Sequence, residues 1–265
     1  MNNPPSQPHA STPPPQLAAS FLADYTAWLW GCGATCIRIH KNVARMAQAL
    51  GVEADVTILP HHVEISVKDR QGVSIPLVCS PIKNAGIDFA MNTRLSRLSW
   101  SLADGKIDFH EAQKAMHLIT HAQKTAWWQV LLLTSLANAS FCRLFGGDAW
   151  AMLVVFIATL LGFRLKQIMT EAKRDVRFTF FCCAFFSSAV CVGATIFGWG
   201  DTPQIALATS VLYLIPGVPY INAVSDLIDK HYLCSFSRFM DAVVLTVCLS
   251  AGLTAGMFIL GTNWF

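Results

Sequence analysis

Charged side chains are scarce in this sequence: Asp, Glu, Lys and Arg make up 13% of its 265 residues, whereas soluble domains carry about 25%. Hydrophobic residues make up 54%, and the mean hydropathy is +0.45. The net charge of +3 is small and evenly spread, so the basic patch that nucleic-acid binding needs is missing. These values exclude an ordinary soluble protein and a nucleic-acid partner, and they predict a membrane protein.

Several sequence signals of secretion and catalysis are also missing. The first basic residue is Arg38, and six of the first fifteen residues are prolines, so we predict a disordered Pro-rich tail over 1–16 and no signal peptide. The nine cysteines form no CxxC pair, which argues against a disulfide framework or a zinc site. Without a phosphate-binding loop or a nucleophile elbow, we expect no catalytic residue, metal or cofactor.

Long apolar windows fill the second half of the chain. A helix that crosses a hydrocarbon core needs about 20 apolar residues, and five windows fit this length. They cover residues 126–145, 149–165, 178–198, 203–227 and 240–261. Tryptophans lie near several window ends, as in an interfacial aromatic belt. We therefore predict a polytopic α-helical membrane protein whose transmembrane domain, residues 125–265, has about five helices, preceded by a small α+β cytoplasmic domain over 17–124.

Basic residues in the short loops predict the orientation. Five lie at the end of the second window or between it and the third, and two lie between the fourth and fifth, whereas the first turn has only Arg143 and the turn at 198–204 has none. Cytoplasmic loops carry the excess of Lys and Arg. The N-terminus is therefore expected in the cytoplasm and the C-terminus on the opposite side of the bilayer.

Residues 21–39 are a possible sixth span, because they are also fairly apolar. Against a span, Asp24 interrupts the run, Arg38 lies at its end, and His40 and Lys41 follow at once. The larger apolar residues recur at helical spacing as one stripe: Leu17, Phe21, Tyr25, Trp28 and Cys32. This spacing favours a soluble amphipathic helix, and we expect one long helix that ends near Gly51 as a glycine cap.

In the rest of the predicted cytoplasmic domain, the spacing of the apolar residues changes. Residues 62–68 alternate between apolar and polar, which predicts a half-buried strand, and a turn leads into a second strand over 73–79. Helical spacing returns over 85–102, and Asp108 with Glu111 resembles a capping box that begins another helix. His110, His117 and His121 share one face of that helix, but a solvated face is a better interpretation than a metal site because no Cys or carboxylate completes a ligand set.

The fourth window contains the most informative motif. Pro216, Gly217 and Pro219 remove helical hydrogen bonds and predict a break. Broken helices occur at membrane depth where protein or water satisfies the freed backbone groups, and transporters bind solutes there. If the helix resumes, Asn222 and Asp226 share a face with Pro219.

Asp226 has two possible interpretations. A carboxylate inside a span costs about 2.5–3.5 kcal/mol and persists mainly where it faces a bundle interior or water, which makes Asp226 a candidate for proton or solute coupling. Alternatively, it lies at a solvated helix end beside Asp229 and Lys230. Thr209, two turns before the break, is a weaker candidate because Thr in spans often bonds its own backbone.

The segment LYLIPGVPYINAVSDLIDKH, residues 212–231, resembles the threonine/serine exporter family in its N-terminal-domain half, and CRLFGGDAW at 142–150 adds a weaker match. The resemblance extends from about residue 20 and is strongest to the larger subunit of the split bacterial exporters implicated in succinate export. It implies a bacterial inner-membrane exporter of small organic or amino acids that acts with a separate small membrane subunit. It also implies Pro216, Gly217 and Pro219 as the helix break, with Asn222 and Asp226 near the pathway.

Two other functions compete with an exporter subunit. One is a membrane-anchored hydrolase that uses the cytoplasmic domain, although no Ser-His-Asp or Cys-His arrangement at a motif spacing is visible. The other is a ligand sensor for which the spans serve only as an anchor. An anchor needs one or two spans and no buried carboxylate, so the exporter is favoured and we expect no enzymatic activity.

Overall fold

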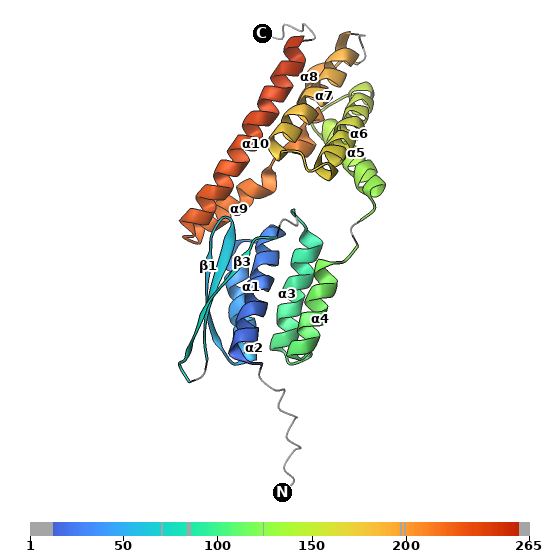
Figure 1. The fold of residues 1–265 in the computed structure, drawn as a ribbon. Coiled ribbons are helices and arrows are strands. Elements are labelled where there is room, and N and C mark those ends of the chain that lie inside the picture. The colour runs from blue at the N-terminus through green and yellow to red at the C-terminus, as the bar shows by residue number, and fades with distance from the viewer. Residues whose placement is uncertain are drawn as a thin grey trace. The chain divides into compact units, whose positions relative to one another are not determined.

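The computed structural model describes residues 13–69, 71–83, 86–123, 125–196, 198 and 200–259. Most of the predicted tail therefore lies outside the described residues, and the first helix already begins at Pro15. The elements run in the order α1 (Pro15–Gly31), α2 (Cys36–Leu50), β1 (Glu53–Ile58), β2 (His62–Lys68), β3 (Ser74–Pro81), α3 (Phe89–Ala103), α4 (Phe109–Thr120), α5 (Trp127–Leu144), α6 (Ala149–Glu171), α7 (Val176–Ile196), α8 (Pro203–Ser210), the 3-10 helix η1 (Leu212–Leu214), α9 (Gly217–Ile228) and α10 (Tyr232–Ile259) (Figure 1).

The chain folds into two compact units, which we describe separately. The first unit takes its described residues from Met1–Gln123 and Val218–Phe239, and the second from Lys124–Gly217 and Met240–Phe265. Most of α9 and the first eight residues of α10 therefore pack with the N-terminal part of the chain. The first unit thus includes a segment from within the predicted transmembrane domain.

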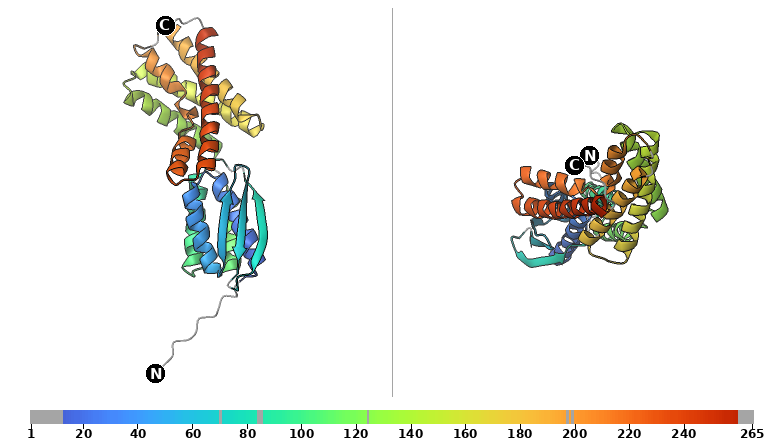
Figure 2. Two further views of the ribbon diagram at one scale, coloured as in Figure 1. Left: turned by 90° about the vertical axis from the view of Figure 1, so that its left-hand side faces the viewer. Right: turned by 90° about the horizontal axis from the view of Figure 1, so that it is seen from above.

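A three-stranded antiparallel sheet forms one layer of the first unit. The strand order is β1-β2-β3, with Val56 opposite Ile65 and Glu64 opposite Cys79. Helices α1 and α2 lie between this sheet and the pair α3–α4 (Figure 1), and the strands are seen face-on in the left view of Figure 2. The predicted strand pair is confirmed as β2 and β3, whereas β1 is an additional strand.

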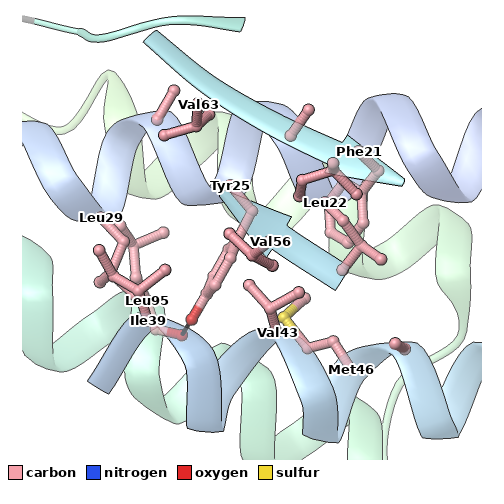
Figure 3. Close-up of a cluster of buried hydrophobic side chains, with 14 of the residues drawn as sticks. Phe21, Leu22, Tyr25, Leu29, Ile39, Val43, Met46, Val56, Val63 and Leu95 are labelled. Carbon is pink, nitrogen blue, oxygen red and sulfur yellow. Dashed lines mark hydrogen bonds between the residues drawn. The ribbon is translucent and has the colours of Figure 1, made fainter. Parts of the chain in front are cut away.

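Helix α1 forms the centre of this unit. Nine of its residues are buried, and Tyr25 is fully enclosed among Val56, Ile39 and Val43 (Figure 3). The Tyr25 hydroxyl donates a hydrogen bond of 3.0 Å to the carbonyl of Leu95 on α3. A helix that is apolar on most sides is buried either in a large core or in a membrane. Protein packing therefore explains the apolar composition that made 21–39 resemble a span.

The prediction of one long helix ending at Gly51 is wrong in one respect. The chain forms two helices, because Gly31 ends α1 and Gly33 adopts φ +90°, a conformation that glycine tolerates and other residues rarely adopt. The second helix does end at the predicted residue: Gly51 has φ 72° and ψ 28°, the left-handed conformation of a glycine C-cap.

Capping side chains fix the starts of α3 and α4. The α3 helix begins at Phe89 with Asp88 as its N-cap, later than the expected residue 85, which lies outside the described residues. At α4 the predicted capping box is present, since Asp108 accepts from the Glu111 N–H and Glu111 accepts from the Asp108 N–H. These bonds satisfy N–H groups that a helix start otherwise leaves free.

The described residues contain three helices long and apolar enough to cross a membrane: α6, α7 over Val176–Ala194, and α10. A fourth span results if Pro203–Leu214 and Gly217–Ile228 are taken together as one broken span. The predicted span at 126–145 corresponds to α5. This helix is not apolar enough to count as a span, because Gln129, Asn138 and Arg143 lower its mean hydropathy. Length and composition therefore support three or four spans where the sequence predicts five.

Close packing in the second unit depends on glycine. A Cβ added at Gly252 of α10 would overlap the Phe181 carbonyl oxygen of α7, and one at Gly256 would overlap the Ser188 hydroxyl. Small residues let membrane helices approach closely. The GxxxG pattern of α10 is therefore the surface that packs against α7.

Gly252→Ala is expected to destabilise the protein by about 1–3 kcal/mol, because the neighbour it would strike is backbone and cannot rotate away. The matched control is Gly193→Ala on α7, where nothing lies within 4 Å of an added Cβ. Alanine there should be neutral or slightly stabilising. Thermal unfolding of the full chain in detergent would compare them, and equal unfolding temperatures would contradict this account of the helix contact.

Candidate functional site

The structure places the chain break of the fourth predicted span between Ser210 and Gly217. Helix α8 ends at Ser210, η1 covers Leu212–Leu214, and α9 begins at Gly217. Pro216 precedes the first residue of α9, and Pro219 lies in its first turn, where a helix needs no backbone donor. Both prolines therefore fit the break without removing a bond from the helix that follows.

Thr209 lies at the broken end of α8, within the second unit. Asn138 of α5 donates from its amide nitrogen to the Thr209 carbonyl at 3.0 Å and to the Thr159 hydroxyl of α6 at 2.6 Å. All three residues are buried, each with at most 3% of its surface exposed. At the break, the Thr209 carbonyl therefore has a partner inside the protein, as broken membrane helices require. The Thr209 hydroxyl itself bonds the Ile205 carbonyl.

A second group of hydroxyls follows along the break. Tyr213 of η1 and Ser187 of α7 are hydrogen bonded at 2.9 Å, and Ser187 also donates a long bond of 3.5 Å to the Ala158 carbonyl. Gly162 of α6 faces both hydroxyls, since an added Cβ would overlap them. Sequence reasoning missed Tyr213, Ser187 and Gly162 because they lie on three different elements.

Asn222 and Asp226 of α9 both contact the turn between α1 and α2, within the first unit. The Asn222 amide donates to the Gly33 carbonyl at 2.9 Å. Asp226 is fully buried, and one of its carboxylate oxygens accepts a bond of 2.8 Å from the backbone N–H of Cys36, the first residue of α2. A carboxylate is favourable at a helix N-terminus, where free N–H groups and the helix dipole converge.

Arg238 of α10 neutralises Asp226. Its guanidinium nitrogen lies 3.1 Å from the second oxygen of the Asp226 carboxylate, and another nitrogen donates to the Ala34 carbonyl at 2.6 Å. The guanidinium also stacks over the Trp30 ring at 3.8 Å. The turn between α1 and α2 is therefore held by side chains from two later helices. We call this group, Asn222, Asp226 and Arg238 with Gly33, Ala34 and Cys36, the Asp226 cluster.

Two thiols lie beside the Asp226 cluster. A hydrogen bond with Cys234 and burial together raise the pKa of the Cys36 thiol, so it stays protonated at neutral pH. The Cys234 thiol donates to the Ile58 carbonyl of β1 at 3.3 Å. Among the described residues, no group of three or more His, Cys, Asp or Glu side chains could hold a metal ion. The cluster can hold a buried ion pair, but it has no metal-ligand geometry.

His40 of α2 and His231 stack with ring centroids 5.0 Å apart and planes 9° from parallel. Burial, and secondly His231, lower the pKa of His40, while Asp55 on β1 acts in the opposite direction. The stability that neutral His40 contributes is therefore present above its ordinary pKa near 6.5 and is lost as the pH falls through the lowered value. Lys230 lies in the same open groove as the two rings and adds positive charge.

We predict that His40→Gln reduces the fall in unfolding temperature between pH 7.5 and pH 5, because glutamine cannot take up the unfavourable proton. The measurement is thermal unfolding of the full chain at a series of pH values. His110→Gln, at an exposed position on α4, is the control and should keep the wild-type profile. An identical pH profile for wild type and His40→Gln would disprove the role of His40.

A family model and two known proteins are similar to this chain over most of its length. The model of the threonine/serine exporter family matches residues 20–260. The protein named Probable succinate transporter subunit YjjP from Klebsiella aerogenes is 25% identical over 232 residues, which cover 86% of this chain and 88% of that protein. The protein of the same name from Escherichia coli (strain K12) is 25% identical over 235 residues, covering 86% and 89%. No solved structure matches the chain.

The family match extends over almost the whole chain, including both compact units and the helix break. It identifies a transporter and not an enzyme, as the missing catalytic motifs predict. With its apolar helices, the break between α8 and α9 and this match, the protein belongs to the threonine/serine exporter family.

Proposed function

We propose that this chain is one subunit of a bacterial inner-membrane exporter of small organic acids or amino acids, with a succinate-like dicarboxylate favoured and threonine or serine next. The observation that carries this proposal is the break between α8 and α9, where the Asn138 side chain donates to the Thr209 carbonyl inside the second unit. Discontinuous helices of this kind form solute sites in transporters. The names of the two relatives, each a probable succinate transporter subunit, support the choice of solute.

The proposed topology has the N-terminus in the cytoplasm and the C-terminus in the periplasm, following the excess of Lys and Arg in the loops after the second and fourth predicted spans. Pro216, Gly217 and Pro219 form the break, and Thr209 lies beside the solute pathway. Asn222 and Asp226 follow the break on α9 and tie it to the turn between α1 and α2. Movement of α9 during transport would therefore be transmitted to that turn.

The partner in this proposal is a separate small membrane subunit. The described residues supply three candidate spans, or four if the bent pair of helices is one span. The name "subunit" of both relatives agrees with a second polypeptide. The lipid bilayer surrounds both, and no nucleic acid is involved.

Efflux of labelled succinate and labelled threonine tests the proposal directly. Cells that lack endogenous exporters of both solutes would express this chain alone, the small subunit alone, or both. We expect rapid loss of one labelled solute only when both chains are present. Retention of both solutes in all three strains, with both proteins shown to be in the membrane, would refute the exporter function.

A further inference from the structure

The Lys166 ammonium is a cation without an anionic partner in the second unit. Its nitrogen lies 4.9 Å from the ring centroid of Phe180 on α7 and 5.8 Å from that of Phe163 on α6. Lys166 takes part in no ion pair among the described residues, and its side chain is partly buried. Aromatic faces attract a cation but leave its charge uncompensated.

Neighbouring charged groups at this end of α6 are engaged elsewhere. The Arg164 guanidinium stacks over the Trp127 ring of α5 at 4.2 Å. The Asp175 carboxylate accepts from the backbone N–H groups of Arg177 and Phe178, and Glu171 is exposed. An ionised side chain at the edge of the hydrocarbon region is costly without a partner and marks a functional site. The described residues supply no carboxylate for Lys166, so an anion from outside the chain would complete the pair.

Neutral hydrogen-bond donors lie in the same region. The Tyr213 ring contacts Phe163 edge to face at 5.9 Å, so the Lys166 ammonium and Tyr213 flank one aromatic ring. When Ser187 turns its hydrogen from the Ala158 carbonyl to Tyr213, the Tyr213 O–H becomes free to donate to a ligand. Gly162, one helical turn before Lys166, leaves the space that this hydroxyl pair occupies.

We propose that Lys166 binds a carboxylate of the transported acid at the cytoplasmic end of the membrane unit, with Tyr213 as an adjacent neutral donor. This inference rests on the proposed export function and adds the residue that selects an anionic solute. The cytoplasmic end is where an exporter receives its solute. Charge-assisted bonds of this type contribute about 1.5–3 kcal/mol, which corresponds to an affinity change of about tenfold or more.

The test uses Lys166→Met, with Lys173→Met as the matched control because Lys173 is exposed in the loop after α6. In cells with the small subunit, labelled succinate efflux at low internal succinate should fall about tenfold or more in Lys166→Met and remain unchanged in Lys173→Met. Lys166→Arg keeps the charge and should retain most of the efflux. Normal efflux in Lys166→Met would show that Lys166 only extends its charge to the membrane interface, and the proposal would fail.

A binding measurement separates this proposal from the export function. Succinate should raise the unfolding temperature of the purified wild-type full chain and of Lys173→Met, but not of Lys166→Met. Such a result in a wild type that exports nothing would support the site and refute export. Equal shifts in all variants, or none in the wild type, would overturn the site. If Lys166→Met does not accumulate, Lys166→Gln and Tyr213→Phe carry the same test, and both should lose succinate stabilisation.

Discussion

Replacing Arg238 with methionine is expected to lower the free energy of unfolding by about 3–5 kcal/mol, because the change leaves a buried carboxylate without its cation. Asp226 is completely buried, and only 12% of the Arg238 side chain is exposed. The single remaining bond from the Cys36 N–H cannot compensate the full charge. The loss should appear as a fall of roughly 10 °C in the unfolding temperature of the full chain.

A double variant shows whether the loss of stability comes from the broken ion pair or from any substitution at these two positions. Asp226→Leu combined with Arg238→Met removes both charges, and we expect it to be clearly more stable than either single variant, since apolar replacement of a buried pair is often neutral. Asp229→Asn is the control, because Asp229 is exposed just after α9. If the two single losses simply add in the double variant, the pair has no coupling energy and this interpretation is wrong.

The Asp226 cluster also shows how the helix break is linked to the rest of the chain. Asn222 and Asp226 lie one turn apart on α9, and both bind the turn between α1 and α2. Arg238 adds a bond from α10 to the same turn. One short loop therefore binds side chains that lie 189 to 204 positions further along the sequence. Displacement of α9 would therefore strain that loop.

Part of this arrangement was predictable from local sequence. Two prolines three residues apart with a glycine between them predict a break, and the structure has α8 and α9 on either side of Pro216. Glycine at the end of a helical pattern predicts a C-cap, as Gly51 shows. These features depend on backbone geometry within a few residues, which the local sequence determines.

The partners of the key side chains could not be predicted in the same way. Arg238 counted only as a loop cation in the sequence, because nothing local shows that it reaches Asp226 and Ala34. Strand β1 was missed, and α1 resembled a possible span, because both depend on what packs against them. Helix α1 is buried on both sides, so it has the apolar composition of a membrane helix, but it is shorter than a membrane-spanning helix.

Asn138→Leu is expected to have the second largest effect, about 2–3 kcal/mol, because it removes the donor that satisfies the Thr209 carbonyl at the broken end of α8. In an unbroken helix that carbonyl would accept a backbone N–H four residues later. Here the chain turns into η1, and the carbonyl is left with the N–H of the cap residue Val211 and the Asn138 amide from the bundle interior. Membrane hydrogen bonds average less than this, but this one serves a carbonyl buried at a break.

Ser140→Ala is the matched control for Asn138→Leu, since Ser140 lies on the same helix, is exposed and bonds only the Leu136 carbonyl within α5. Thermal unfolding should show the loss in Asn138→Leu alone. Asn138→Asp sharpens the test, because a carboxylate of similar shape can accept but, when ionised, not donate, and it should be at least as damaging. Wild-type stability in both Asn138 variants would mean that another group satisfies the Thr209 carbonyl, and that Asn138 does not support the helix break.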